Sequence, residues 1–140
     1  MSIPVPLLEP MQSQLITAIR HELPGALSIY AFGSRITGGA MPDSDLDLSV
    51  LTQGYADPVK LWELASQLTD IAGVNVDLAD FRSASTVLQH QILVTGRRLW
   101  SLDIQADLFE LFVLREKFNL DDARAALMKD IQIRGSVYVK

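Results

Sequence analysis

The stretch that decides the fold of this chain reads Ala31-Phe32-Gly33-Ser34-Arg35 and, after six intervening residues, Pro42-Asp43-Ser44-Asp45-Leu46-Asp47-Leu48. Glycine before serine lets the backbone approach a ligand closely, and a helix that begins there offers free amide groups to a phosphate. Asp45 and Asp47 are two residues apart, so in an extended strand both side chains leave the same face of the sheet. The stretch therefore predicts a phosphate-binding turn beside a pair of carboxylates.

A third carboxylate, Asp77, lies in another apolar segment of the chain. Val74, Val76 and Leu78 occupy one face of the strand that this segment predicts, and Asp77 occupies the other face. A neighbouring strand with this pattern brings the third carboxylate to the first two.

Three carboxylates in one place repel one another strongly unless cations neutralise them. Hard oxygen ligands suit magnesium, which keeps several waters and completes its coordination with substrate phosphates. We therefore predict that Asp45, Asp47 and Asp77 bind two magnesium ions, and that Gly33 and Ser34 bind a nucleoside triphosphate.

The rest of the chain alternates between helical and strand patterns. Apolar residues at helical spacing and short apolar runs bounded by turn residues define these elements. Helices are predicted at residues 7–21, 58–72, 83–95 and 103–118 and from residue 121 to about residue 134, and strands at 27–32, 46–51, 74–80 and, as an edge strand, 97–102. The predicted fold is α/β (α+β), with a small mixed sheet of about four strands and helices mostly on one face. We expect one domain over residues 1–140, with a core at about 25–102 and a C-terminal helical extension at about 103–140.

This pattern resembles the DNA polymerase β-like nucleotidyltransferase superfamily. The resemblance rests on the Gly33-Ser34 turn, on its spacing to Asp45 and Asp47 and on the third carboxylate, Asp77. Within the superfamily, the chain is most similar to the minimal nucleotidyltransferases, the MNT proteins that act as antitoxins to HEPN-domain toxins. The similarity covers roughly residues 25–100, and the last forty residues match only as generic helix.

The resemblance implies transfer of AMP from ATP to a tyrosine hydroxyl of a cognate HEPN ribonuclease toxin, which blocks the toxin's RNA cleavage. Asp45 and Asp47 would bridge the two magnesium ions, and Asp77 would ligate the second ion and accept a proton. Arg35, directly after the phosphate turn, is a candidate for a further contact with phosphate or with the partner.

Composition narrows the possible functions. The chain has 140 residues, 49% of them hydrophobic, no cysteine and a net charge of −5. This length suits one domain with a single core, and no apolar stretch is long enough to span a membrane. The N-terminus lacks the pattern of a signal peptide, so we expect a cytoplasmic protein. No basic cluster exceeds Arg97-Arg98, which argues against direct binding of nucleic acid. The net negative charge favours a basic protein partner.

Two other functions fit part of the pattern. One is an antitoxin that acts only by stoichiometric binding, and the other is a small-molecule nucleotidyltransferase of the aminoglycoside-modifying type. Three intact carboxylates argue against the first, and the absence of a second domain argues against the second. Nearby, Asp43 lies in a turn and Asp80 at a strand end, so we expect neither to bind metal. The apolar stripe Leu108, Leu111 and Phe112 is expected to be mainly core, and the alternative is that part of it meets a partner.

Overall fold

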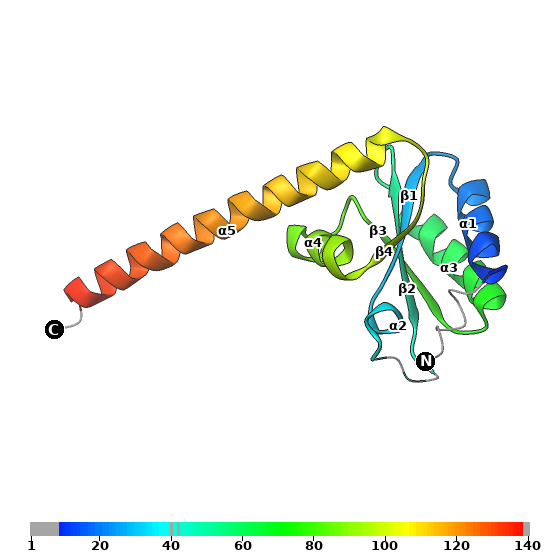
Figure 1. Cartoon of the computed structure of the whole chain (residues 1–140), viewed down its shortest axis with the longest axis horizontal. Coiled ribbons are helices and arrows are strands. Elements are labelled where there is room, and N and C mark those ends of the chain that lie inside the picture. Colours follow the sequence, from blue (N-terminus) through cyan, green and yellow to red (C-terminus); the bar gives the residue numbers. More distant parts are fainter. Residues whose placement is uncertain (1–8, 40, 42, 139–140) are drawn as a thin grey trace.

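The computed structural model of this chain describes residues 9–39, 41 and 43–138, with side chains up to residue 133. Within these residues, four strands form one sheet in the order β3-β2-β1-β4 (Figure 1). The strands are β1 (Ala26–Phe32), β2 (Leu46–Thr52), β3 (Val76–Asp80) and β4 (Arg97–Ser101). β1 pairs antiparallel with β2 and β4, whereas β2 pairs parallel with β3. The prediction of a small mixed sheet with residues 97–102 at an edge is confirmed.

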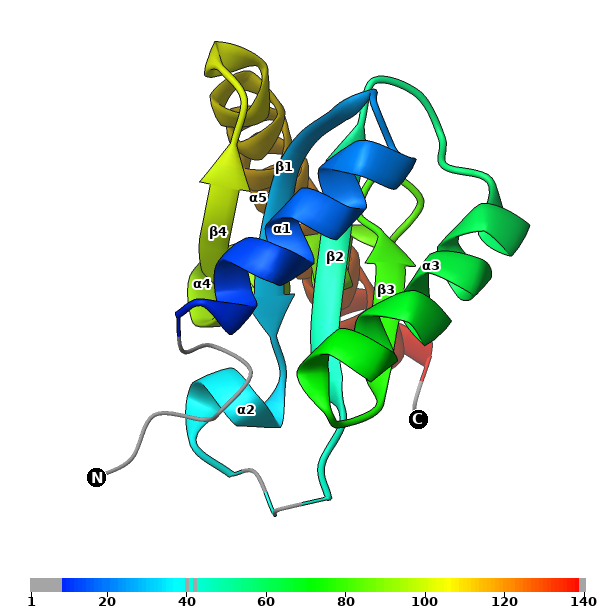
Figure 2. The same ribbon diagram turned by 90° about the vertical axis from the view of Figure 1, so that its right-hand side faces the viewer.

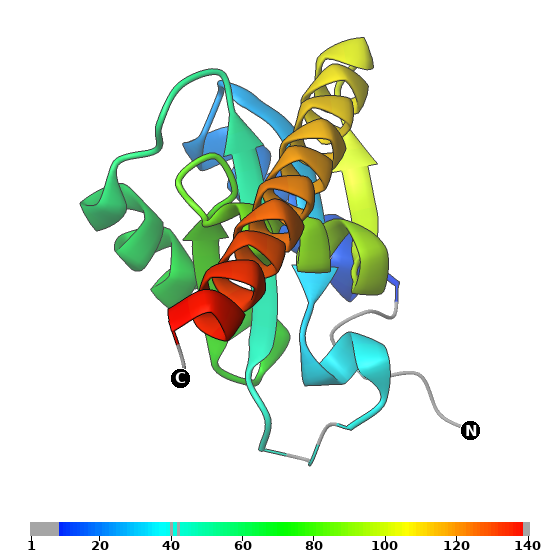
Figure 3. The same ribbon diagram turned by 90° about the vertical axis from the view of Figure 1, so that its left-hand side faces the viewer.

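Helices cover both faces of this sheet. Figure 2 shows α1 (Met11–Glu22) and α3 (Pro58–Ala72) on one face, and Figure 3 shows α4 (Thr86–Thr95) and α5 (Ile104–Tyr138) on the other. The expectation that helices lie mostly on one face is therefore wrong. The physical reason is visible in β1, whose first six residues are all buried and so need cover on both sides.

The ends of the helices follow from local sequence. Asp57 caps α3 by accepting a hydrogen bond from the Val59 amide at 3.1 Å, and Gly73 ends the helix with a φ of 75°. These bounds agree with the predicted helix 58–72. α1 begins at Met11, and residues 7 and 8 of the predicted first helix lie outside the described residues.

The C-terminal region differs from its prediction. α5 is one continuous helix, where the sequence predicted two helices with a break between Phe118 and Asp121. Lys117 Nζ and Asp121 Oδ1 form an ion pair at 2.6 Å that spans one turn across the predicted break. Such i,i+4 pairs contribute a few tenths of a kcal/mol to a helix, and the turn-favouring Asn119 and Asp121 are accommodated within it.

A polar network, buried only at its Tyr30 end, holds the first part of α5 on the sheet. The Tyr30 hydroxyl on β1 donates a hydrogen bond to Glu110 Oε2 at 2.7 Å, and Arg98 on β4 contacts Glu110 at 2.8 Å and Asp107 at 2.7 Å. Burial raises the pKa of the Tyr30 hydroxyl, which therefore stays a proton donor to Glu110. Beyond Val113, no described side chain of α5 is buried, and Figure 1 shows the helix extending away from the sheet.

The apolar stripe of α5 faces solvent. Leu108, Leu111 and Phe112 are each more than half exposed, so the expectation that they form core is wrong. Ala106 and Val113 are the buried residues of this helix, on a different side of it. Among the described residues, no helix combines the length and the hydrophobicity that crossing a membrane requires.

Candidate active site

The predicted site residues come together at one end of the sheet. Gly33 and Ser34 connect the end of β1 to the short helix α2 (Ser34–Thr37), while Asp45 and Asp47 lie at the start of β2 and Asp77 near the start of β3. β2 runs antiparallel to β1 and parallel to β3, so the end of β1 meets the starts of the other two strands (Figure 1). The three segments that sequence reasoning selected are therefore spatial neighbours.

The strand register places two of the carboxylates side by side. Asp47 is the Cα partner of Asp77 in the parallel β2–β3 pair, and neighbouring strands are about 4.8 Å apart. The flanking Leu46 and Val76 are buried in the core under α1 and α3, so both carboxylates leave the opposite face. Asp45 lies one residue before the first residue of β2 and is exposed.

The electrostatics of the site centre on Asp47. Its partial burial raises its pKa, and the negative charges of Asp77 and Asp45 raise it further. No three carboxylate or imidazole side chains within the described ranges converge into a complete metal site by themselves. The donor set still suits magnesium, which keeps several waters and takes substrate phosphates as ligands.

We expect Asp47→Asn to stabilise the metal-free protein at pH 7. Because the pKa of Asp47 is higher in the folded than in the unfolded chain, the folded state binds the proton more readily and stability falls as pH rises through this range. The melting temperature at pH 7 should rise by on the order of 1–3 °C. The gain should vanish below about pH 3.9, where the carboxyl is protonated in both states.

Thermal unfolding in the presence of a chelator, at pH 7 and at pH 3.5, measures this effect. Asp43→Asn is the matched control, because Asp43 is an exposed turn carboxylate in the same loop. A lower melting temperature of Asp47→Asn at pH 7 would show that repulsion and burial do not dominate at this position.

Gly33 contacts Asp47 directly through its backbone. Its φ is +83°, a region that side chains of L-residues rarely adopt, and a Cβ placed on it would lie 2.2 Å from Asp47 Oδ2. The sequence predicted that this glycine allows a close approach to phosphate. The structure adds a second reason for glycine, because any side chain here would displace a proposed metal ligand.

Arg35 is buried rather than extended into solvent. It is 7% exposed, and its Nε donates a hydrogen bond to the Ser44 carbonyl oxygen at 2.8 Å. This bond ties α2 to the residue immediately before Asp45, so Arg35 positions the phosphate turn relative to the carboxylates. Its predicted contact with phosphate or a partner stays a prediction.

Two further carboxylates, Asp80 and Asp43, were not expected to bind metal. Asp80 accepts hydrogen bonds from the Ala56 and Arg82 amides, both at 3.1 Å, and so caps the turn after β3. Asp43 is exposed in the turn before β2.

Two cavities were not foreseen from the sequence. One, of about 390 Å³, is bordered by Asp45, Asp77 and α3 and contains the exposed Trp62. The only signal for it was a tryptophan on the predicted solvent face of an amphipathic helix. The other, of about 330 Å³, is lined by α1 and by residues of β1 and β4.

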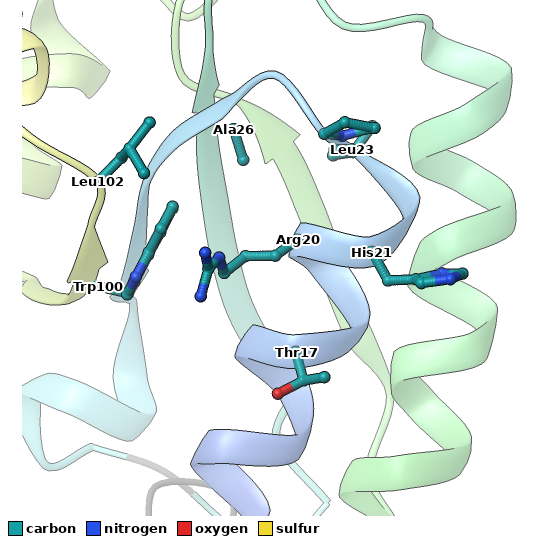
Figure 4. A pocket seen from close by; sticks show the side chains of 8 residues that line it. Thr17, Arg20, His21, Leu23, Ala26, Trp100 and Leu102 are labelled. Atoms are coloured by element: carbon teal, nitrogen blue, oxygen red, sulfur yellow. The ribbon is translucent and has the colours of Figure 1, made fainter.

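This second cavity, shown in Figure 4, is separate from the carboxylates. The Arg20 guanidinium lies 4.4 Å from the centroid of the Trp100 ring, and Figure 4 shows these two side chains facing one another while His21 points away. None of the six predicted site residues lines it. It is therefore not part of the candidate active site.

The four-stranded sheet, the glycine–serine turn and the paired carboxylates define a nucleotidyltransferase domain. Residues 14–105 match the family described as Polymerase beta, Nucleotidyltransferase, and the chain belongs to this family. It is 34% identical over 120 residues to the protein adenylyltransferase MntA of Shewanella oneidensis, an alignment that covers 86% of each chain.

Two solved structures are also similar to this chain. One is a toxin–antitoxin structure with AMP-PNP, with a TM-score of 0.76 and 34% identity, covering 86% of this chain and 98% of the other. The second is a tri-AMPylated Shewanella oneidensis HEPN toxin in complex with MNT antitoxin, with a TM-score of 0.70 and 32% identity, covering 86% and 95%. The resemblance to the minimal nucleotidyltransferase antitoxins is thus confirmed.

Proposed function

We propose that this chain is an antitoxin enzyme that transfers AMP from ATP to a tyrosine hydroxyl of a cognate HEPN ribonuclease toxin, and so blocks RNA cleavage by the toxin. The observation that carries the proposal is the pairing of Asp47 with Asp77 beside Asp45, in a chain 34% identical to a protein adenylyltransferase. The tri-AMPylated HEPN toxin of the similar complex supports the choice of acceptor. Because ATP is the substrate, we place the reaction in the cytoplasm.

In this mechanism, Gly33 and Ser34 hold the β and γ phosphates of ATP through the turn between β1 and α2. Asp45, Asp47 and Asp77 are the residues that would hold the magnesium ions. When bound, these ions would neutralise charge on the triphosphate and lower the pKa of the acceptor hydroxyl, which for tyrosine is ordinarily about 10.

The chemical step is an in-line displacement at the α-phosphorus. The tyrosine oxygen forms a bond to this phosphorus while the bond to the bridging oxygen breaks and pyrophosphate leaves. Asp77 accepts the proton from the tyrosine hydroxyl. The chain's own residues thus position the reactants and carry the proton, which is most of what phosphoryl transfer requires of a protein.

Stoichiometric binding is the second candidate function. The observation that favours it is the long exposed surface of α5, where apolar residues on the solvent side offer contact area to a partner. Such a complex would neutralise the toxin only while it lasts, which separates the two functions experimentally.

We expect inhibition of the toxin to persist after this protein has been removed, because AMP on tyrosine is joined by a covalent phosphodiester. The toxin is incubated with this protein, ATP and magnesium, separated under denaturing conditions and refolded. Mass spectrometry should find added AMP, and ribonuclease activity should stay low. The control is the same incubation without ATP. Unchanged mass with full recovery of ribonuclease activity would leave stoichiometric binding as the function.

A further inference from the structure

One side of α5 carries apolar residues far beyond the part of the helix that lies on the sheet. Ala106 and Val113, which are buried, are seven residues apart, and Leu120 and Leu127 follow at the same spacing. Seven residues make almost two complete helical turns, so these four side chains lie on one side of the helix. Ile131, four residues after Leu127, lies on this side too. We call these five residues the core-side stripe.

The chain itself covers only the first part of the core-side stripe. Val113 packs in one buried cluster with Tyr30 of β1 and Ile92 of α4. Farther along the helix, Leu127 is 58% exposed and Ile131 is 51% exposed. The side of α5 that forms core over the sheet therefore continues as an apolar surface that no other described element covers. An exposed apolar surface of this kind indicates a contact with another protein.

The direction of this surface relates it to the candidate active site. α5 lies on the face of the sheet that carries α4, and Asp47 and Asp77 leave the sheet on this same face (Figure 3). Figure 1 shows α5 leaving the sheet above α4, and α2, which begins at the phosphate turn, lies on the same side of α5 as α4. A partner that packs on the core-side stripe beyond Val113 is therefore held on the carboxylate side of the sheet.

The proposed function requires a docking surface outside the active site. The acceptor is one tyrosine of another protein, and binding energy from the remote parts of a substrate is what orients its reacting group. The core-side stripe beyond Val113 offers such a surface on the correct face of the sheet. A second copy of this chain at this place would occupy the carboxylate side without supplying the acceptor, so the toxin is the occupant that the reaction requires.

We propose that the core-side stripe beyond Val113 docks an amphipathic helix of the HEPN toxin. Its spacing of seven and four residues is the one with which two helices pack side by side, so Leu120, Leu127 and Ile131 meet the apolar side of the toxin helix. Arg124 lies on the same side of α5, four residues after Leu120, so the matching toxin surface is apolar with an acidic group.

This inference rests on the proposed function and adds the surface on which the toxin is held. The residues of the core-side stripe are positioning residues, because they act on the toxin as a whole and do not contact the reacting atoms. The toxin is then bound by one surface and modified at another, and binding can be measured apart from transfer.

The test compares two variants that carry the same substitution. Ile131→Ser removes an apolar side chain from the core-side stripe, and Ile133→Ser removes one that is similarly exposed, at 56%, from the opposite side of α5. The two positions are separated by a rotation of about 200° around the helix axis. Isoleucine and serine have similar helix propensities, so both variants should keep the helical content of the unaltered chain in circular dichroism.

Toxin affinity is measured by titrating the full chain with the cognate HEPN toxin in the absence of ATP, and AMP transfer is measured separately with α-labelled ATP. Ile131→Ser should raise both Kd and KM for the toxin by about tenfold, the loss expected when one strong interface contact is removed. Leu127→Ser should have an effect of the same size, whereas Ile133→Ser should leave both constants unchanged. KM for ATP should stay unchanged in all three variants, because the phosphate turn lies on another element.

The outcomes separate this inference from the proposed function. Unchanged toxin affinity in both Ile131→Ser and Leu127→Ser would overturn the inference. An equal loss of affinity in Ile131→Ser and Ile133→Ser would also contradict it, because the contact would then not lie on the core-side stripe. Dimers of the free chain that Ile131→Ser abolishes, with toxin affinity unchanged, would make a second copy the occupant. Normal toxin binding without AMP transfer by the unaltered chain would overturn the proposed enzymatic function and leave the docking surface in place.

Discussion

Combined substitution of Asp45→Ala and Asp47→Ala is expected to lower the rate of AMP transfer by about 10³-fold or more. The two carboxylates are the proposed bridging ligands of both magnesium ions, and a bound metal contributes several kcal/mol of charge stabilisation to such a transition state. Labelled AMP on the toxin, measured in single-turnover reactions at saturating ATP, reports this loss. Asp77 alone is not expected to retain either ion in a productive position.

The double variant should remain folded, because it relieves a repulsion. Burial and the neighbouring carboxylates already raise the pKa of Asp47, which shows that its charge is held at a cost in free energy. Asp43→Ala is the matched control, since it removes an exposed carboxylate from the same loop and should leave transfer unchanged. Full transfer by a well-folded Asp45→Ala/Asp47→Ala variant would refute the two-metal site.

The second large effect is expected from Gly33→Val, which should reduce AMP transfer by about 10²-fold or more. A Cβ at this position would lie 2.2 Å from Asp47 Oδ2, so the carboxylate must rotate away from its place beside Asp77. Misplacement of a catalytic group by about 1 Å can cost 10²-fold in rate. The backbone conformation at Gly33 adds on the order of 1–3 kcal/mol of strain to any other residue.

Gly38→Val separates these two causes. Gly38 also has a positive φ, of 97°, but no atom lies within 4 Å of the position that a Cβ would take there, so the substitution strains the backbone without touching Asp47. It should lower stability and largely preserve transfer. Ser34→Ala should weaken the use of ATP more mildly than Gly33→Val does. Equal rates of AMP transfer by the Gly33→Val and Gly38→Val variants would show that the close approach of Gly33 to Asp47 is not needed for transfer.

Most of the sheet was predictable from the sequence, because each strand is a short apolar run bounded by turn residues. The period of two also placed Asp77 correctly, opposite the buried Val76 and Leu78. The packing of helices on both faces of the sheet was not predictable in the same way. A continuous apolar run shows that a strand is buried, but it does not say which helices pack on its two sides. The continuity of α5 was not predictable either, because the helix runs through Asn119 and Asp121, residues of low helix propensity, and the Lys117–Asp121 ion pair across this point forms only once the helix exists.

The candidate site was predicted residue by residue, but its internal contacts were not. A turn motif and three spaced carboxylates are local patterns that the sequence displays directly. The burial of Arg35 against the Ser44 carbonyl and the packing of Gly33 on Asp47 depend on how separate segments meet. The cavity that both Trp62 and Asp77 line likewise requires the packing of α3 along β3, which no single segment encodes.

The uncovered part of α5 has a consequence for the lifetime of the chain. Residues 114–133 lack buried side chains, so this stretch is held mainly by its own backbone hydrogen bonds. Helices without tertiary packing open at little free-energy cost, and such locally unfolded segments are where proteases cut. Any partner that covers this helix would therefore protect the chain from degradation, and the turnover of the free chain would exceed that of the complex.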